Sequence, residues 1–265
     1  MYELIGAGRT AEVFDFGDDK VLKLFRTEYL DLAEKEYEVA KILESFTSAA
    51  PKLYGRLVTD GRFGIIYEKK DGLPMAAKLE RNPMLIRRYA HMTAALHNAM
   101  HTKNIKRLPP IRPRLRDAIL RAQALSTGMR EAVLRRLEAL PDGEKLCHGD
   151  FHMGNIMVDG DAMAAIDWLD ATMGDPLADV ARTYIVLGSP AIKKEGHPMV
   201  LRAMRSFCES FARQYLSEYL RLGEIKERDV LLWIAPVAAA RMAECIAGEE
   251  QYLTGLIGQS LDAQL

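Results

Sequence analysis

Short apolar runs separated by turn residues make up the N-terminal part of the chain, and this pattern predicts β-strands. The run at residues 21–25 is apolar apart from Lys23, so we expect a strand whose two faces are both covered. Residues 57–67 predict a hairpin, because Asp60 and Gly61 readily adopt the positive φ angles of a tight turn. This part of the chain is therefore expected to form a small sheet.

A helix is predicted between these strands, at residues 31–46, and Asp31 with Glu34 would form a capping box at its start. Glu36 interrupts the apolar face of this helix, as Lys23 interrupts the apolar strand. A buried ammonium group is costly without an anion, so we expect Lys23 and Glu36 to form an ion pair. The alternatives are a lysine on an edge strand that reaches water and a glutamate on the exposed side of the helix.

The pattern becomes helical after Asp71, where we place the boundary between a first domain, residues 1–70, and a second domain, residues 71–265. Four longer helices are expected. They run along the apolar stripe from Ile86 to Met100, from a cap at Asp175 to Gly188, from Arg202 to Leu222 with Gly223 after it, and from Val230 to Gly248 with Asp229 as the cap. Pro236 should kink or break the last of these helices. The predicted fold class is α+β, with a small β-rich part followed by a larger, mainly helical part.

Composition narrows the classes of protein that the chain can represent. Its 265 residues include 36 basic and 37 acidic ones, a net charge of −1, which argues against a protein that coats nucleic acid or an anionic membrane. The 3 cysteines are widely spaced, so neither a disulfide framework nor a zinc site is expected, and a cytoplasmic location is favoured. No signal-peptide pattern opens the chain, and the longest apolar run, at 230–240, is too short to span a bilayer.

A glycine-rich segment, Gly6-Ala7-Gly8-Arg9-Thr10, lies between two strand-like runs. Glycines at such a place let backbone N–H groups approach an anion closely. A simple glycine turn within a hairpin is the alternative. No G-x-x-x-x-G-K-[ST] pattern occurs in the chain, which excludes a P-loop.

Residues 147–167 carry the strongest chemical signal. Two short apolar strands flank an Asp-Gly turn whose centre falls near Asp161, so the sequence predicts a hairpin with Asn155 opposite Asp167. Two oxygen-bearing side chains at one end of a hairpin suit a hard cation such as Mg²⁺. Asp150, in the loop just before the hairpin, would accept a proton from a hydroxyl. A polar hairpin with capping aspartates is the alternative.

The same segment resembles a known family. Asp150 and Asn155 have the D-x-x-x-x-N spacing of the protein-kinase catalytic loop, with His148-Gly149-Asp150 in place of His-Arg-Asp. Ile166-Asp167-Trp168 stands where kinases carry Asp-Phe-Gly. With the further segment Gly174–Asp179, the chain resembles the aminoglycoside phosphotransferase and choline kinase branch of the protein-kinase-like fold.

This resemblance extends over about residues 4–188 and implies a two-lobed fold with a small β-rich N-lobe and a larger, mainly helical C-lobe. It also implies an enzyme that uses ATP and Mg²⁺ to transfer the γ-phosphate to a hydroxyl of a small molecule, such as an aminoglycoside or an amino alcohol. The glycine segment fits loosely, because Ala11 replaces the third glycine. The implied roles are nucleotide binding by Gly6, Gly8, Arg9, Thr10, Lys23, Glu36, Tyr67, Glu68 and Lys69, Mg²⁺ binding by Asn155 and Asp167, and proton acceptance by Asp150.

Three other polar residues each allow both a functional and a structural interpretation. By resemblance, Asp179 would brace the catalytic loop, and a local helix-capping role is the alternative. His97 and His101 have the i, i+4 spacing of a metal-binding pair on a helix. No glutamate accompanies them as in H-E-x-x-H, so a structural pair is expected.

The acceptor is the least defined part of this interpretation. Asp170 and Glu244 are weak candidates for acceptor binding, and the 9 acidic residues between Asp142 and Asp179 favour a cationic acceptor over an anionic one. A nucleotide-binding pseudo-enzyme that acts through partners is one alternative function, although such a protein needs no proton acceptor. A protein kinase is another, although no Ala-Pro-Glu motif follows Asp167.

Overall fold

The computed structural model describes residues 2–44, 49–191 and 197–262. The chain divides into two compact units, one made of Met1–Arg81 and Met153–Ala171 and the other of Asn82–His152 and Thr172–Leu265. The first unit is rich in strands and the second is mostly helical, which confirms the predicted α+β class. The predicted boundary at residue 70 cuts the sequence once, whereas each of these units consists of two separate segments. That boundary stays a prediction.

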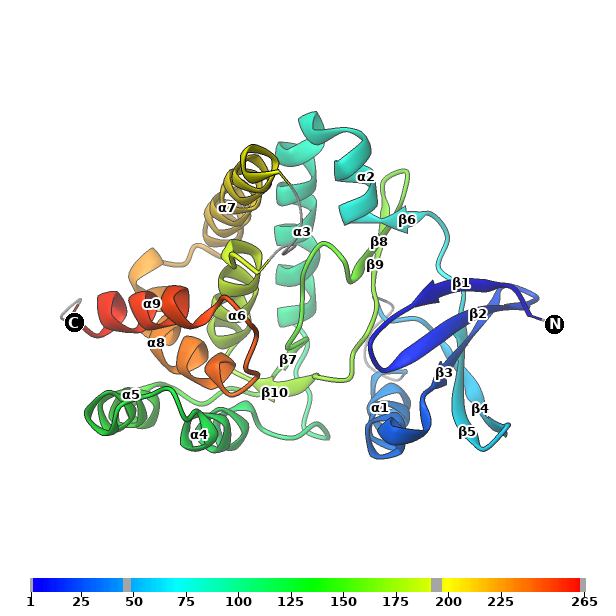
Figure 1. The fold of residues 1–265 in the computed structure, drawn as a ribbon, viewed down its shortest axis with the longest axis horizontal. Coiled ribbons are helices and arrows are strands. Elements are labelled where there is room, and N and C mark those ends of the chain that lie inside the picture. Colours follow the sequence, from blue (N-terminus) through cyan, green and yellow to red (C-terminus); the bar gives the residue numbers. More distant parts are fainter. Residues whose placement is uncertain (1, 45–48, 192–196, 263–265) are drawn as a thin grey trace. The chain divides into compact units, whose positions relative to one another are not determined.

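A five-stranded antiparallel sheet dominates the first unit, with the strand order β1-β2-β3-β5-β4 (Figure 1). Its strands are β1 (Leu4–Ala7), β2 (Ala11–Gly17), β3 (Lys20–Phe25), β4 (Leu53–Thr59) and β5 (Arg62–Glu68). The predicted hairpin joins β4 to β5 through Asp60 and Gly61, whose φ angles are 50° and 71°. Strand β3 lies between β2 and β5, so Lys23 is on an interior strand and the edge-strand alternative is wrong.

Helix α1 (Leu30–Leu43) buries its apolar face together with Glu36, as the spacing predicts. The predicted capping box is wrong: Tyr29 is the N-cap residue, without a side-chain bond, and Asp31 lies in the first turn. The short 3₁₀ helix η1 (Thr27–Tyr29) leads directly into α1, so the chain enters the helix through a continuous turn instead of a capped start. The last predicted positions of this helix, 45 and 46, lie outside the described residues.

A second sheet of the first unit has the order β6-β8-β9, built from β6 (Leu73–Pro74), β8 (Ile156–Asp159) and β9 (Ala162–Ala165). The short helix α2 (Met75–Arg81) follows β6. Gly72, at φ 90°, passes so close to β8 that a Cβ atom on it would lie 2.0 Å from the carbonyl oxygen of Val158. Glycine is therefore required at this crossing.

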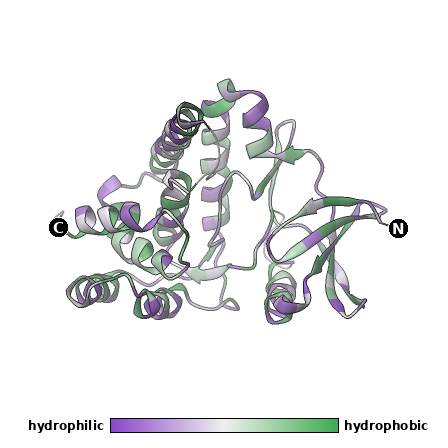
Figure 2. Ribbon diagram, viewed as in Figure 1, coloured by the Kyte–Doolittle hydropathy of each residue, from purple (hydrophilic) through white to green (hydrophobic). Residues whose placement is uncertain are grey.

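The second unit packs helices around a small strand pair, β7 (Lys145–Cys147) and β10 (Thr172–Gly174). Both hydrophobic and hydrophilic residues occur along these helices, as Figure 2 shows, which is the composition of amphipathic helices. In the described part of the chain, no helix is long and apolar enough to cross a membrane. After the short 3₁₀ helix η2 (Pro83–Leu85), the helices are α3 (Ile86–His101), α4 (Ile111–Arg121), α5 (Thr127–Ala139), α6 (Pro176–Gly188), α7 (Pro198–Gly223), α8 (Glu227–Met242) and α9 (Glu250–Asp262).

Helix α6 agrees with its prediction, including Asp175 as the N-cap, but the last helices differ from theirs. Helix α7 begins at Pro198, and the left-handed residue after it is Glu224 rather than Gly223. Helix α8 begins at Glu227 and continues through Pro236, because its central residues are buried on all sides and packing offsets the one lost backbone bond. The predicted end of this helix is wrong, since the chain leaves it after Met242 and forms α9 separately.

Candidate active site

Lys23 and Glu36 form the predicted ion pair inside the first unit. The Lys23 Nζ atom lies 2.7 Å from Oε2 and 2.9 Å from Oε1 of Glu36, whose side chain is only 3% exposed. The hydroxyl of Tyr67 donates a third bond to Glu36 Oε1, at 3.1 Å. Strand β3 and helix α1 thus supply one charge each, and the pair satisfies both inside an otherwise apolar layer.

A second carboxylate contacts the same ammonium group. Asp167 Oδ1 lies 3.1 Å from Lys23 Nζ, and the Asp167 side chain is 46% exposed. Burial alone would lower the pKa of Lys23, but the carboxylates of Glu36 and Asp167 outweigh it and raise that pKa above its usual value. Lys23 is therefore a fixed cation that holds a buried anion on one side and a half-exposed anion on the other.

The hairpin of β8 and β9 brings Asn155 and Asp167 to the same end, with a register that differs from the prediction by one residue. Ile156 pairs with Ala165, and the Asn155 carbonyl accepts from the Ile166 N–H at 2.9 Å. The turn is centred between Gly160 and Asp161 rather than at Asp161, so Asn155 stands opposite Ile166 and not opposite Asp167. Asp167 itself has φ 63°, a left-handed conformation that ends the extended backbone.

Both residues offer oxygen atoms, the amide oxygen of Asn155 and the carboxylate of Asp167. Mg²⁺ prefers such ligands, so this donor set fits the ion. Asp167 contacts Lys23 through Oδ1 and its side chain is 46% exposed, so a cation from solvent can reach this carboxylate. The chemistry of the two side chains agrees with the predicted magnesium role.

The glycine segment connects β1 to β2, and neither Gly6 nor Gly8 has a positive φ angle. A Cβ atom on Gly6 would meet Val13 at 3.7 Å, and one on Gly8 would meet the Ala11 carbonyl oxygen at 3.6 Å, which are ordinary contacts. The hairpin itself therefore does not require glycine at either position. The Gly8 N–H donates to the Ala11 carbonyl oxygen at 2.8 Å and closes the connection between β1 and β2, so both the hairpin turn and the phosphate role stay open as predictions.

Arg26 holds this connection, a role that no pattern in the sequence predicts. Its backbone N–H donates to Thr10 at 2.9 Å, and its guanidinium group donates to the carbonyl oxygens of Arg9 and Gly8 at 3.3 and 3.4 Å. The carbonyl oxygens of the segment are thus turned toward Arg26. Signals for such a role are absent from the sequence because it depends on backbone atoms of another strand.

The predicted hinge, Tyr67-Glu68-Lys69, has its backbone donors engaged. The Glu68 N–H donates to the carbonyl oxygen of Lys52 and the Lys69 N–H to that of Asp19, both at 2.8 Å. The Lys69 side chain pairs with Asp15 at 2.5 Å. A nucleotide base at this segment would have to use groups other than these two N–H donors.

The loop His148-Gly149-Asp150 belongs to the second unit, where Asp179 on α6 holds it. The fully buried Asp179 carboxylate accepts from the N–H of His148 at 2.5 Å and from the N–H of Gly149 at 2.9 Å. These bonds confirm the predicted bracing of the loop by Asp179. Burial alone would raise the pKa of Asp179, but hydrogen bonds from the His101 and His97 rings hold it well below its usual value.

His97 and His101 form a buried structural pair with this aspartate, as expected. Each ring places Nε2 on Asp179, at 3.0 and 3.3 Å, and Nδ1 on a tyrosine hydroxyl, Tyr215 for His97 and Tyr219 for His101, both at 2.6 Å. Burial lowers the pKa of His97 to about 3, with the neighbouring His101 as a second cause. Both nitrogens of each ring are engaged by protein groups, so the cluster is complete without a metal ion.

Asp150 has two basic neighbours in the second unit. Its Oδ2 lies 3.4 Å from His152 Nε2, and its Oδ1 lies 4.0 Å from an Nη atom of Arg182. Burial alone would raise the pKa of Asp150, but the hydrogen bond and charge of His152, followed by the charge of Arg182, lower it to about 2. Asp150 is therefore ionised at neutral pH and can accept a proton.

The sequence agrees with a family model over residues 2–229, and that model describes the phosphotransferase enzyme family. The chain belongs to the phosphotransferase enzyme family. This assignment confirms the resemblance drawn from the catalytic-loop motifs. No curated protein sequence matches the chain.

Solved structures similar to this phosphotransferase share its kinase-like fold at low sequence identity. The aminoglycoside-3'-phosphotransferase of type VIII is 16% identical, with a TM-score of 0.64 and coverage of 91% of this chain and 93% of the other. The ADP-bound aminoglycoside phosphotransferase APH(2'')-Ib is 15% identical, with a TM-score of 0.57 and coverage of 100% and 93%. A choline/ethanolamine kinase family protein from Mesorhizobium loti is 17% identical, with a TM-score of 0.57 and coverage of 100% and 88%.

The two weak acceptor candidates of the phosphotransferase both contact cations of their own unit. Asp170 lies 4.0 Å from Lys35 in the first unit. Glu244 lies 2.5 Å from Arg182 and 3.1 Å from Arg241 in the second. Their charges are thus partly neutralised inside the protein, which weakens the electrostatic argument for a cationic acceptor.

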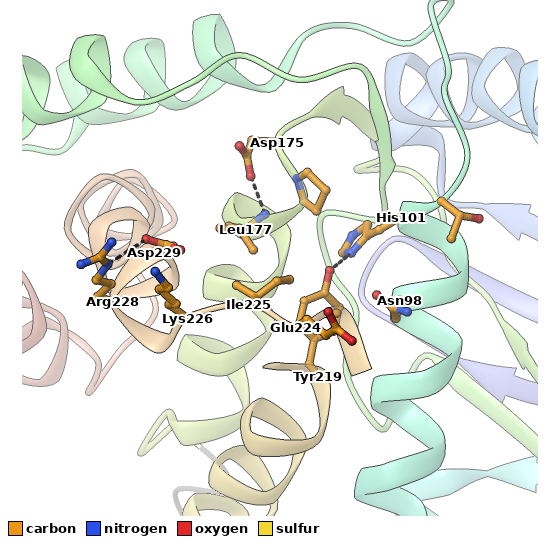
Figure 3. Close-up of a pocket in the computed structure, with 13 residues that line it drawn as sticks. Asn98, His101, Asp175, Leu177, Tyr219, Glu224, Ile225, Lys226, Arg228 and Asp229 are labelled. Atoms are coloured by element: carbon orange, nitrogen blue, oxygen red, sulfur yellow. Dashed lines mark hydrogen bonds and ion pairs between the residues drawn. The ribbon is translucent and has the colours of Figure 1, made fainter. Parts of the chain in front are cut away.

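A pocket of about 490 Å³ lies elsewhere in the second unit of the phosphotransferase, at the ends of α3 and α7 and the beginnings of α6 and α8 (Figure 3). His101 and Tyr219 form part of its wall, and the ring of His101 reaches the Tyr219 hydroxyl. Asp150 and Glu244 are not among the residues that line it. The pocket therefore differs from the place where the sequence predicts proton transfer.

Proposed function

We propose that this phosphotransferase moves the γ-phosphate of ATP to a hydroxyl group of a small molecule. The observation that carries the proposal is the position of Lys23, an interior-strand cation held by Glu36 that also reaches Asp167. A lysine fixed between a buried and a half-exposed carboxylate suits the phosphates and metal of a nucleotide better than it suits a purely structural role. The titles of similar structures name ADP, ATP and GDP, which supports a purine nucleotide as the donor.

The residues of the first unit would bind and orient the nucleotide. Lys23 would hold the α- and β-phosphates, and the segment from Gly6 to Thr10 would cover them. Asn155 and Asp167 would hold Mg²⁺, which when bound supplies positive charge that offsets the charge of the transferring phosphoryl group. Glu36, which holds Lys23 in place, would act on the nucleotide through that lysine.

Asp150 would act on the acceptor. Its ionised carboxylate would orient the hydroxyl and accept its proton, while the hydroxyl oxygen forms the new bond to phosphorus and ADP leaves with the bridging oxygen. Bracing of the loop by Asp179 keeps this carboxylate in one position, which reduces the ordering that the reaction would otherwise need.

The class of acceptor is inferred from the compounds named in the titles of similar structures. We retain a cationic small molecule, such as an amino sugar or amino alcohol, because the neighbours whose titles name streptomycin, kanamycin or choline act on or bind such compounds. The carboxylates of Asp170 and Glu244 give this choice little support, since both contact cations.

Release of ADP from Mg-ATP, measured across amino sugars, amino alcohols, neutral sugars and hydroxy acids, tests the proposal. We expect acceptor-dependent ADP release with at least one amino compound, and its loss in Asp150→Asn. ADP release that no member of any class stimulates, from an enzyme that binds Mg-ATP, would favour the pseudo-enzyme alternative. Stimulation by neutral or anionic acceptors alone would overturn the cationic class and leave the phosphotransfer proposal intact.

A further inference from the structure

Helix α6 holds Gly149 through two side chains that lie one turn apart. Asp179 accepts from the Gly149 N–H at 2.9 Å, and Arg182 donates from Nε to the Gly149 carbonyl oxygen at 3.2 Å. Positions three apart on a helix share a face, so a single helical face fixes both polar groups of this residue. Gly149 has φ 82°, a left-handed conformation that glycine adopts without steric cost.

The rest of the Arg182 guanidinium group lies between two carboxylates. One Nη atom is 4.0 Å from Asp150 Oδ1, and the other is 2.5 Å from Glu244 Oε1. The side chain is only 16% exposed, so these contacts are made largely out of water. The planar fork of arginine can serve a carbonyl group and two carboxylates at once, which the ammonium group of lysine cannot do in the same geometry.

Glu244 is itself held in place by a second buried pair. Arg241 contacts Glu244 at 3.1 Å and binds both carboxylate oxygens of Glu249, at 2.7 and 2.6 Å. Ser189, just after α6, also donates to Glu249. A continuous series of polar contacts therefore runs from the segment between α8 and α9 through Glu244 and Arg182 to the loop that carries Asp150.

We propose that Arg182 is a positioning residue for Asp150, and that Glu244 sets the position of Arg182. The inference rests on the proposed role of Asp150 as the proton acceptor. In this arrangement Arg182 fixes the peptide before Asp150 through the Gly149 carbonyl, and its charge favours the ionised form of the Asp150 carboxylate. Glu244 serves this network, which differs from the acceptor-binding role that the sequence suggests for it.

The proposal has an electrostatic consequence for Asp150 that a purely packing role would lack. Among the described residues of the second unit, the titratable or charged groups that lower the pKa of Asp150 are His152, Arg182 and His148. Loss of the Arg182 charge should raise the pKa of Asp150, because an opposite charge nearby favours the ionised carboxylate. Arg182→Lys should give a smaller rise, because the charge stays while the fork is lost.

The test measures the titration of Asp150 directly. Protein labelled with ¹³C at aspartate side-chain carboxyls is titrated by NMR, and the Asp150 signal is identified by its absence in Asp150→Asn. We expect the Asp150 pKa to rise in Arg182→Met and to rise less in Arg182→Lys. Arg205→Met is the matched control, since Arg205 pairs with Glu209 on the exposed face of α7.

Kinetic measurements on the same variants separate positioning from simple loss of structure. In Arg182→Met we expect a kcat about 10-fold or more lower, an unchanged KM for ATP, and an acid limb of the pH profile shifted to higher pH. Glu244→Gln should show the same shift at smaller size. Partial recovery of kcat in Arg182→Lys would support a role through charge and donated bonds.

Two results would overturn the inference. One is an Asp150 signal that titrates in Arg182→Met as it does in the wild type; the other is a folded Arg182→Met protein with wild-type kcat and pH profile. If the wild type transfers no phosphate to any acceptor, the proposed function fails, and the NMR titration still decides whether Arg182 controls Asp150. If Arg182→Met unfolds, the comparison is made between Arg182→Lys and the wild type.

Discussion

The side chain of Lys23 has two roles, one in stability and one in the proposed nucleotide binding. It lies on the interior strand β3, where its contact with Glu36 satisfies a charge that is otherwise buried among apolar groups. The same ammonium group contacts the half-exposed Asp167, which is the residue proposed to hold Mg²⁺. Variants of Lys23 should therefore change both stability and nucleotide binding, and a second substitution should separate the two effects.

Lys23→Met should lower the free energy of unfolding by about 3 kcal/mol or more, because it leaves Glu36 as an uncompensated buried charge. Lys20→Met, on the same strand, should change stability little. Adding Glu36→Leu to Lys23→Met should restore most of the lost stability, since apolar groups can replace a buried ion pair, but should not restore phosphotransfer. Urea unfolding and ADP release measure the two quantities. A double variant no more stable than Lys23→Met would show that the buried glutamate is not the source of the loss.

A variant of Gly8, in the connection between β1 and β2, tests whether this glycine is needed for stability or for nucleotide binding. Gly8→Ala should leave the thermal unfolding midpoint unchanged, because the added Cβ would make only an ordinary contact at 3.6 Å. It should weaken ATP binding several-fold, because the N–H groups could no longer approach the phosphates as closely. Gly72→Ala is the structural control and should lower the midpoint clearly, since its Cβ would lie 2.0 Å from the Val158 carbonyl oxygen. ATP binding at wild-type strength in Gly8→Ala would count against the phosphate role of this segment.

Helices α3, α6 and α7 meet at the buried cluster of His97, His101 and Asp179, and this makes stability dependent on pH. Burial lowers the pKa of His97 from 6.5 to about 3. A group whose pKa is lower in the folded state contributes stability above its unfolded pKa and loses it as the pH falls. The free energy of unfolding should therefore decrease as the pH falls from about 6.5 toward 3.

His97→Gln should make this decrease shallower, by up to one proton or about 1.4 kcal/mol per pH unit, although the variant starts from a lower stability at pH 7. Gln251→Ala, at an exposed position of helix α9, is the control, because it neither adds nor removes a titratable group. Chemical unfolding at a series of pH values gives both slopes. A His97→Gln protein with the wild-type slope would mean that this histidine is not the group that titrates.

The pattern of apolar and turn residues predicted several helices and strands correctly. The wrong predictions, of helix ends and hairpin register, share a physical cause. The interior strand, the Asp60-Gly61 hairpin and helix α6 with its Asp175 cap follow from local pattern and turn chemistry. The start of α1, the register of the β8–β9 hairpin and the path through Pro236 do not, because each depends on a neighbouring turn or on burial from several sides. Local sequence contains little information about such tertiary effects.

Across the whole chain, residues distant in sequence supply each part of the candidate chemistry. Residues 153–171 return to the first unit, so Asp167 contacts Lys23 across 144 positions of sequence. In the second unit, Glu244 contacts Arg182 across 62 positions. The Lys23–Glu36 pair was predictable because each residue interrupts an apolar face. Arg182 was not, because an arginine on a helix has no pattern that reveals its long-range partners.

The most direct test of the account is ³¹P NMR of the wild-type protein with Mg-ATP and the acceptor panel. We predict that the ATP signals decline as ADP signals grow, together with a new phosphomonoester signal that requires the acceptor. Asp150→Asn should reduce the rate of this conversion by about 10²–10⁴-fold while ATP still binds. Conversion of ATP to ADP and free phosphate only, or a phosphomonoester formed by Asp150→Asn at the wild-type rate, would contradict the account.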